Sequence, residues 1–261
     1  MRKEECPPLV GRSVSGARYD LAYVFSAPLV ERRAGGKLHV LQQLDIQSER
    51  EIIRTVVKCC QKRVRVVESV ATVASVSDIF SRGLRALHYS GHGTKNAVTF
   101  EKGLGRDGDP SRASEMHVVK GKELQRLLEA SRVTQNLKFV FVSACHSEPV
   151  GQCFVKAGVD HVVAIDTNYG VLDIAAKVFC RSLYSALLAG KTVREAFNTA
   201  QQTVRMEPAI REPFVEAAKF KLLPEVSDDD TAHDVSIFGD LCDGVSFCYV
   251  PLHFTRILLT V

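Results

Sequence analysis

Strand-like and helix-like segments alternate along most of this chain, and this alternation constrains the fold more than any other feature. The strand-like segments are short apolar runs at Tyr19–Ala27, Val64–Val70, Leu84–Ser90, Lys138–Ser143 and His161–Asp166. Between them, apolar residues recur every three or four positions, as they do in amphipathic helices. This order of elements is typical of a mostly parallel sheet covered by helices on both faces. Residues 19–206 therefore predict an α/β fold with three layers.

Several residues mark where the predicted helices begin and end. The segment Ser48–Glu51 has the form of a capping box, and Thr192–Glu195 has the same form. A short helix is expected around Ser77–Arg82, with Gly83 as its stop signal. Ser147 is placed to cap the helix that follows the Lys138–Ser143 run.

The remaining segments are irregular or peripheral. Leu38–Asp45 alternates polar and apolar residues, so it either continues the sheet or forms a hairpin with the first strand. Residues 102–115 are glycine-rich and charged, which favours a surface loop or insertion. We expect a flexible N-terminal segment at 1–18, a domain at 19–224 and a C-terminal extension at 225–261. Phe220–Leu223, at the end of this domain, and Val245–Val250, in the C-terminal extension, are expected to be short strands.

Composition excludes several classes of function. The chain has 261 residues with 34 basic and 30 acidic side chains, mixed along its length, for a net charge of +4. That charge is too small and too dispersed to predict binding to nucleic acid. The eight cysteines include no C-x-x-C pair, so no standard zinc site is expected. Neither a signal peptide nor a membrane span is visible, which favours reduced thiols in an intracellular, cytoplasmic setting.

Two groups able to do chemistry follow the ends of predicted strands. His92 lies between Gly91 and Gly93 after one apolar run, and Cys145 follows another. In a parallel α/β sheet, functional residues gather beyond the carboxyl ends of the strands. If the two strands are neighbours, the thiol and the imidazole form a nucleophile–base pair. The N–H groups of Gly93 and Cys145 could then hold an oxyanion, and the following helix would point its N-terminus at the thiol.

Other interpretations of these residues remain open at this point. A cysteine at a strand end is often only a small core residue. His88, inside its strand, is expected to be a hydrogen-bonded core residue and not a catalyst. A zinc site formed by His88, His92, Cys145 and His146 has no standard ligand spacing to support it. Gly190-Lys191-Thr192 is similar to the end of a phosphate-binding loop, but it lacks the first glycine and follows a helix.

The motifs HYSGHG and SACHSE, in this order and context, resemble those of the CHAT domain, a caspase-like (clan CD) cysteine peptidase related to caspases, metacaspases and separases. The likeness extends from about Tyr19 to Asp240. It implies a three-layer caspase-like fold and metal-independent hydrolysis of a protein or peptide substrate without a cofactor. Cys145 would be the nucleophile and His92 the acid and base, with Gly93 and Cys145 forming the oxyanion hole.

The sequence departs from the family pattern beside the cysteine. Metacaspases carry an acidic residue two positions before the cysteine, where this chain has Ser143. Asp166 and Asp173 are then candidate acids of the substrate pocket, although Asp173 is equally placed to cap a helix. Arg106 and Arg112, in the 102–115 loop, are candidate sites of self-cleavage.

Relatives join this domain to repeat or nucleotide-binding modules, which are possible partners of a free-standing unit or fragment. The alternative function is a catalytically silent CHAT module that acts in interactions within a signalling protein. Retention of both His92 and Cys145 favours the peptidase.

Overall fold

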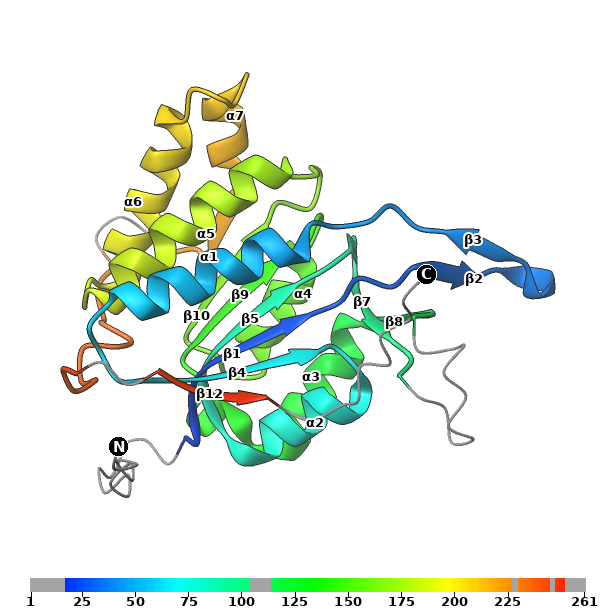
Figure 1. Ribbon diagram of the computed structural model, residues 1–261, viewed down its shortest axis with the longest axis horizontal. Coiled ribbons are helices and arrows are strands. Elements are labelled where there is room, and N and C mark those ends of the chain that lie inside the picture. The colour runs from blue at the N-terminus through cyan, green and yellow to red at the C-terminus, as the bar shows by residue number, and fades with distance from the viewer. Residues whose placement is uncertain (1–16, 104–113, 227–229, 245–246, 252–261) are drawn as a thin grey trace, which may run out of the picture.

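A seven-stranded sheet forms the centre of the molecule (Figure 1). The computed structural model describes residues 17–103, 114–226, 230–244 and the backbone of 247–251. Across the sheet the strands are β11 (Phe220–Leu223), β10 (His161–Ile165), β9 (Phe139–Ser143), β5 (Leu84–Ser90), β1 (Tyr19–Phe25), β4 (Val64–Val70) and β12 (Phe247–Pro251). All neighbouring pairs are parallel except β10 and β11.

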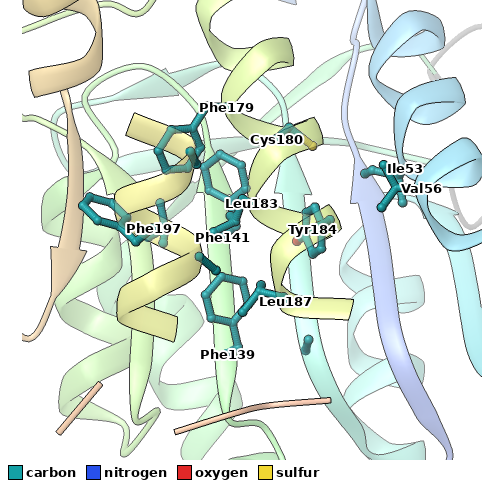
Figure 2. Close-up of a cluster of buried hydrophobic side chains, with 14 of the residues drawn as sticks. Ile53, Val56, Phe139, Phe141, Phe179, Cys180, Leu183, Tyr184, Leu187 and Phe197 are labelled. Atoms are coloured by element: carbon teal, nitrogen blue, oxygen red, sulfur yellow. The ribbon is translucent and has the colours of Figure 1, made fainter. Parts of the chain in front are cut away.

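Helices cover both faces of this sheet, which confirms the predicted three-layer α/β fold (Figure 1). One face carries α1 (Ile46–Cys59), α5 (Asp173–Leu188), α6 (Val193–Met206) and α7 (Pro213–Ala218); the other carries α2 (Val73–Arg82), α3 (Gly121–Ser131) and α4 (Glu148–Lys156). Each strand therefore contributes alternate side chains to two separate cores. Figure 2 shows part of the first core, where Phe139 and Phe141 of β9 lie against Leu183 and Leu187 of α5.

Two small sheets lie outside the central one. Strands β2 (Val30–Arg32) and β3 (Leu38–Val40) form an antiparallel hairpin, joined through the 3₁₀ turn Ala34–Gly36, that projects from the body (Figure 1). Both alternatives predicted for Leu38–Asp45 are therefore wrong, because only Leu38–Val40 is a strand and it pairs with β2, neither continuing the central sheet nor pairing with β1. Strands β6 (Gly93–Thr94), β7 (Ala97–Glu101) and β8 (Met116–Lys120) form the second small sheet. Arg106 and Arg112 lie outside the described residues, so their self-cleavage remains a prediction.

Three helix boundaries differ from those predicted. Helix α1 is capped by Asp45, whose carboxylate accepts a hydrogen bond from the Ser48 N–H, so the predicted capping box at Ser48 is wrong. Asp45 and Ser48 are both good cap residues, and the choice between them depends on tertiary contacts. Helix α2 begins at Val73, four residues before the predicted start, with Thr72 and Ser75 forming its capping box. Asp173 does not cap α5, since the N-cap is Leu172.

Other predicted boundaries are confirmed. Gly83 ends α2 in a conformation with φ of 75° that favours glycine, and Thr192 and Glu195 form the predicted capping box of α6. The described part of the C-terminal region extends the domain, because β12 pairs with β4 in the central sheet and buried Arg85 bonds to Asp240 and the Ile237 carbonyl. A domain boundary at 224 remains a prediction. None of the helices in the described residues has the length and apolar character needed to cross a bilayer.

A buried histidine pair links β10 to the segment after β11. The Nδ1 atoms of His161 and His233 lie 2.8 Å apart, and His233 Nε2 lies 2.9 Å from the Pro224 carbonyl oxygen. Because the carbonyl can only accept, Nε2 of His233 carries the proton and its Nδ1 accepts from His161. Burial, followed by the charge of His233, lowers the pKa of His161 to about 4.

We predict that this pair makes the protein less stable as the pH falls. The folded-state pKa of His161 lies below the ordinary value of 6.5, so its contribution is complete above about pH 6.5 and is lost progressively towards pH 4. The free energy of unfolding in urea should decrease between pH 7 and pH 5.5, above the range in which carboxylates titrate. In His161→Asn, whose amide N–H can still donate to His233, the decrease should be smaller. An equal decrease in both proteins would contradict the prediction.

A second prediction concerns the core on the α5 side. The ring of Phe179 stacks on Phe220 of the edge strand with centroids 3.8 Å apart, and it also packs against Phe141 and Phe197. Phe179→Ala should lower the free energy of unfolding by about 3–5 kcal/mol, because it leaves a cavity among these rings. Phe214, 71% exposed on α7, provides the matched control, and Phe214→Ala should change stability by less than about 0.5 kcal/mol.

Candidate active site

The strands that precede His92 and Cys145 are neighbours. β5 and β9 pair in parallel, with Ser90 directly opposite Ser143, and the Gly91 N–H donates to the Ser143 carbonyl at 3.2 Å. His92 lies two residues after Ser90, and Cys145 lies two residues after Ser143. Both therefore emerge at the same edge of the sheet, as the spacing predicted.

Gly93 brings the two loops into contact. A Cβ atom added at Gly93 would fall inside van der Waals contact of the Cys145 carbonyl oxygen and 3.0 Å from Ala144 Cβ. Only a residue without a side chain leaves room for this approach. His92 and Cys145 are both partly exposed, so the thiol and the imidazole border the same open edge.

The His92 ring is oriented by a backbone carbonyl. Its Nε2 lies 2.8 Å from the carbonyl oxygen of Gln42, in the segment between β3 and α1. A carbonyl can only accept, so in the neutral ring the proton is on Nε2 and the lone pair is on Nδ1. Thr99 fixes the backbone of the same residue, since its N–H and hydroxyl both donate to the His92 carbonyl. An oriented imidazole with a free Nδ1 is suited to act as a base.

Cys145 is bordered by the loop that follows β10. His146 adopts the left-handed conformation, with φ of 57°, and its Nδ1 lies 2.8 Å from the Thr167 carbonyl. Glu148, at the start of α4, accepts hydrogen bonds from the N–H and hydroxyl of Thr167. A Cβ at Gly170 would lie 3.5 Å from the Cys145 sulfur. These contacts form one wall beside the thiol.

Ser147 does not act as the predicted side-chain cap of α4. Its hydroxyl donates to the Val142 carbonyl at 2.9 Å and accepts from the Ile165 N–H at 3.0 Å. The buried hydroxyl thus satisfies two backbone groups of the central sheet and is not available to the helix. Pro149 occupies the first turn of α4, as predicted.

A buried carboxylate lies next to both strand ends. Ser90 and Ser143 donate their hydroxyls to the two carboxylate oxygens of Glu49, in the first turn of α1. His88 lies below, with Nε2 at 3.3 Å from Glu49 and Nδ1 at 3.1 Å from the Tyr184 hydroxyl. His88 is fully buried and lies within hydrogen-bond distance of Tyr184, which confirms the prediction of a hydrogen-bonded core residue.

The Glu49 carboxyl is ionised at neutral pH. Burial by itself raises its pKa, but the His88 ring and the hydroxyls of Ser90 and Ser143 together outweigh that effect and hold the pKa below its ordinary value. Glu49 therefore carries a negative charge that His88 and the two serine hydroxyls stabilise.

Glu49, His88 and Cys180 are also the group of potential metal ligands that the described residues bring together, with ligand atoms within 4.8 Å of one another. Burial raises the pKa of the Cys180 thiol well above its ordinary value, so the thiolate that a metal would need is disfavoured. Glu49 is already bonded to two hydroxyls. The chemistry of this group is that of a hydrogen-bonded cluster.

The two predicted pocket acids carry ion pairs of their own. Asp166 lies 3.4 Å from Lys221 and accepts the Asn168 N–H, while Asp173 lies 2.6 Å from Lys177. Their roles, and those of His92, Gly93, Ser143 and Cys145 in catalysis and binding, remain predictions.

Sequence reasoning missed two participants in this site. Gln42 acts through its backbone carbonyl, which no side-chain pattern reveals. Glu49 was assigned to a capping box at Ser48–Glu51, yet it precedes Ile53 by four residues and so lies on the buried stripe of α1. A carboxylate in line with apolar residues was the available signal.

We predict that Gly93→Ala separates the two loops. The added methyl group meets the Cys145 backbone, which cannot move aside as a side chain would, so stability should fall by about 1–3 kcal/mol. Gly170→Ala is the matched control, because its methyl group would make only an ordinary contact with the sulfur. Thermal unfolding of both variants measures the difference. Equal stability of Gly93→Ala and wild type would argue against the close approach.

Comparisons with known proteins agree with the family resemblance. The model of the CHAT domain matches residues 11–233. A comparison with curated protein sequences finds no match.

Solved structures add a likeness of fold. One described as "Structure of Protease" superposes with a TM-score of 0.56 at 9% identity, covering 85% of this chain and 49% of its own. The Arg-specific cysteine proteinase gingipain R superposes with a TM-score of 0.49 at 13% identity, and the match covers 78% of this chain and 46% of that structure. For pro-sf-caspase-1 the TM-score is 0.43 at 10% identity, and the match covers 75% of this chain and 87% of that structure. The chain thus spans about half the length of the first two structures.

Proposed function

This chain belongs to the CHAT domain family, and from that premise we propose that it is a cysteine endopeptidase acting through Cys145 and His92. Its fold is of the caspase-like, cysteine-peptidase type. The observation that carries the proposal is the contact between the Gly93 and Cys145 backbones, combined with a His92 ring whose Nε2 is held by Gln42. The proposed substrate is a protein or peptide, cleaved without a metal or cofactor.

In the proposed reaction the thiol of Cys145 transfers its proton to Nδ1 of His92 as the sulfur attacks the scissile carbonyl carbon. The carbonyl electrons move to the oxygen, which the N–H groups of Gly93 and Cys145 stabilise. When the carbon–nitrogen bond breaks, His92 returns the proton to the leaving amine and a thioester remains on Cys145. His92 then takes a proton from water, the hydroxide attacks the thioester, and the acid product leaves as the thiol is restored.

Gln42 has a definite role in this scheme. When the imidazolium forms, its Nε2–H continues to donate to the Gln42 carbonyl, so the ring is stabilised without rotating during the reaction. A third group that orients the base completes the usual arrangement of nucleophile, base and orienting partner. Here that group belongs to the backbone.

We expect single substitutions of the pair to abolish turnover. Cys145→Ala removes the nucleophile and His92→Ala removes the base, so peptide hydrolysis should fall by at least about 1000-fold in each. A thiol-directed peptide probe should label wild type and not Cys145→Ala. Cys59, an exposed free cysteine, provides the control, and Cys59→Ala should label and turn over normally. Labelling that persists in Cys145→Ala would overturn the proposal and favour a silent interaction module.

Repeat or nucleotide-binding modules remain proposed partners on the strength of the family resemblance. Their test is co-purification of separately expressed modules of these types with this chain.

A further inference from the structure

A wide groove opens between the small β6–β8 sheet and the helices α3 and α4. Its volume is about 1050 Å³, and the described residues line it from the turn after β6, from the end of β8, from the first turn of α3 and from one side of α4. The lining residues of α4 recur at helical spacing from its first residue, Glu148, to its last, Lys156. Nine helical residues extend about 13 Å, so the groove is elongated and suits an extended chain.

Within the described residues, the lining of this groove carries four exposed lysines. They come from the turn after β6, the end of β8, the start of α3 and the end of α4: Lys95, Lys120, Lys122 and Lys156. No acidic side chain of the described ranges lies within ion-pair distance of any of them, whereas Lys177, for example, pairs with Asp173. Glu148 is the acidic residue of the described lining, and its carboxylate already accepts two hydrogen bonds from Thr167.

Two of these lysines face the same point in the groove. Burial raises the pKa of the Cys153 thiol, and the charges of Lys156 and Lys122 both oppose that rise. The helices that carry them are in direct contact, because a Cβ atom added at Gly121 would lie 2.9 Å from the Cys153 sulfur. Lysines from α3 and α4 therefore converge on one stretch of the groove floor.

A second groove shows that lysines alone do not make such a surface. It has a volume of about 710 Å³ and lies at the opposite edge of the central sheet, where β5, β9 and β10 begin. There Lys138 pairs with Asp160 and Arg85 pairs with Asp240, so its charges are neutralised within the protein. In the first groove the positive charge is left for a ligand.

The first groove borders the proposed active site. Thr94, one of its lining residues, directly follows Gly93, whose backbone contacts Cys145. In the proposed reaction His92 protonates the leaving amine, so the leaving nitrogen lies next to the His92 loop. The substrate segment that begins at this nitrogen therefore departs along the residues that follow His92, and these residues form a wall of the groove.

Resting on the proposed peptidase function, we propose that this groove binds an acidic stretch of the protein substrate on the carboxyl-terminal side of the scissile bond. An extended chain rises about 3.3 Å per residue, so about four residues span the length of α4. An aspartate or glutamate in this stretch meets Lys122 on one side and Lys156 on the other. Glu148 lies at the end of α4 nearest Cys145 and repels an acidic side chain there, so acids bind best from about the third residue after the bond.

The distribution of charge favours a peptide over a compact anion. The four lysines come from four different elements along an elongated groove, which matches several carboxylates carried by one chain. Each lysine is exposed, so a single contact is weak and the sum of the contacts decides the binding. For the same reason, binding should weaken as the ionic strength rises.

The test digests a library of peptides derived from a whole proteome and identifies the cut sites by mass spectrometry. At about the third to sixth residues after the cut, wild type should show aspartate and glutamate about two- to three-fold more often than the undigested library does. In the double variant Lys122→Glu, Lys156→Glu this enrichment should fall to about 1 or below, because the groove then repels carboxylates.

The double variant Lys37→Glu, Lys58→Glu supplies the matched control. Both lysines are exposed, neither lines the groove, and the change in net charge is the same, so the wild-type enrichment should remain. Absence of enrichment in wild type, or its persistence in Lys122→Glu, Lys156→Glu, overturns this inference and leaves the peptidase function intact. Cleavage by wild type that is no greater than cleavage by Cys145→Ala overturns the peptidase function itself.

A binding measurement tests the groove separately from turnover. Cys145→Ala should bind a fluorescent peptide with four consecutive glutamates at least about 10-fold more tightly than the same chain with Lys122→Glu and Lys156→Glu. Equal affinity overturns the inference. Displacement of the peptide by less tripolyphosphate than unlabelled peptide also overturns it, because the groove would then prefer a compact polyanion. If the double variant does not fold, the wild-type enrichment and this competition decide.

Discussion

The edge of the sheet that carries the proposed active site depends on one buried carboxylate that joins two neighbouring strands. Glu49 reaches from the first turn of α1 and accepts the hydroxyls of Ser90 and Ser143, which end β5 and β9. Each of those serines is followed two residues later by a proposed catalytic group. The spacing between the histidine and the cysteine loops is therefore tied to the position of a helix that belongs to neither strand.

Helix α1 couples the two halves of the proposed site through a second contact. The chain entering the helix carries the Gln42 carbonyl, which orients the His92 ring, and Asp45, which caps the helix and bonds to Lys177 of α5. One continuous segment, Gln42 to Glu49, therefore both orients the His92 ring and joins the ends of β5 and β9 through the two serines. Any shift of α1 along the sheet would alter both together, and the packing of Ile53 and Val56 in the core opposes such a shift (Figure 2).

Many elements of this fold were predictable because apolar runs and glycines act locally. Val64–Val70 and Leu84–Ser90 are strands with the predicted bounds, and Gly83 ends α2 as expected. The errors lie where two local solutions compete. Asp45 and Ser48 can both cap a helix, and Asp45 prevails with the help of a lysine from another helix. Ser147 has the right position for a cap, but its hydroxyl is hydrogen-bonded to the backbone of Val142 and Ile165 in the central sheet.

The sequence by itself determined the family, the alternation of strands and helices, and the two residues proposed to react. Each of these three depends on short motifs or on residue spacing within a segment, which can be identified without the tertiary structure. Only the tertiary structure decided what surrounds them. Glu49, Gln42 and Gly170 come from segments distant along the chain, and the hydrogen-bonded partners of a side chain are set by packing and not by neighbours in sequence. For the same reason, sequence reasoning placed the candidate pocket acids at Asp166 and Asp173 and did not predict the buried carboxylate of Glu49, which lies against Ser90, Ser143 and His88.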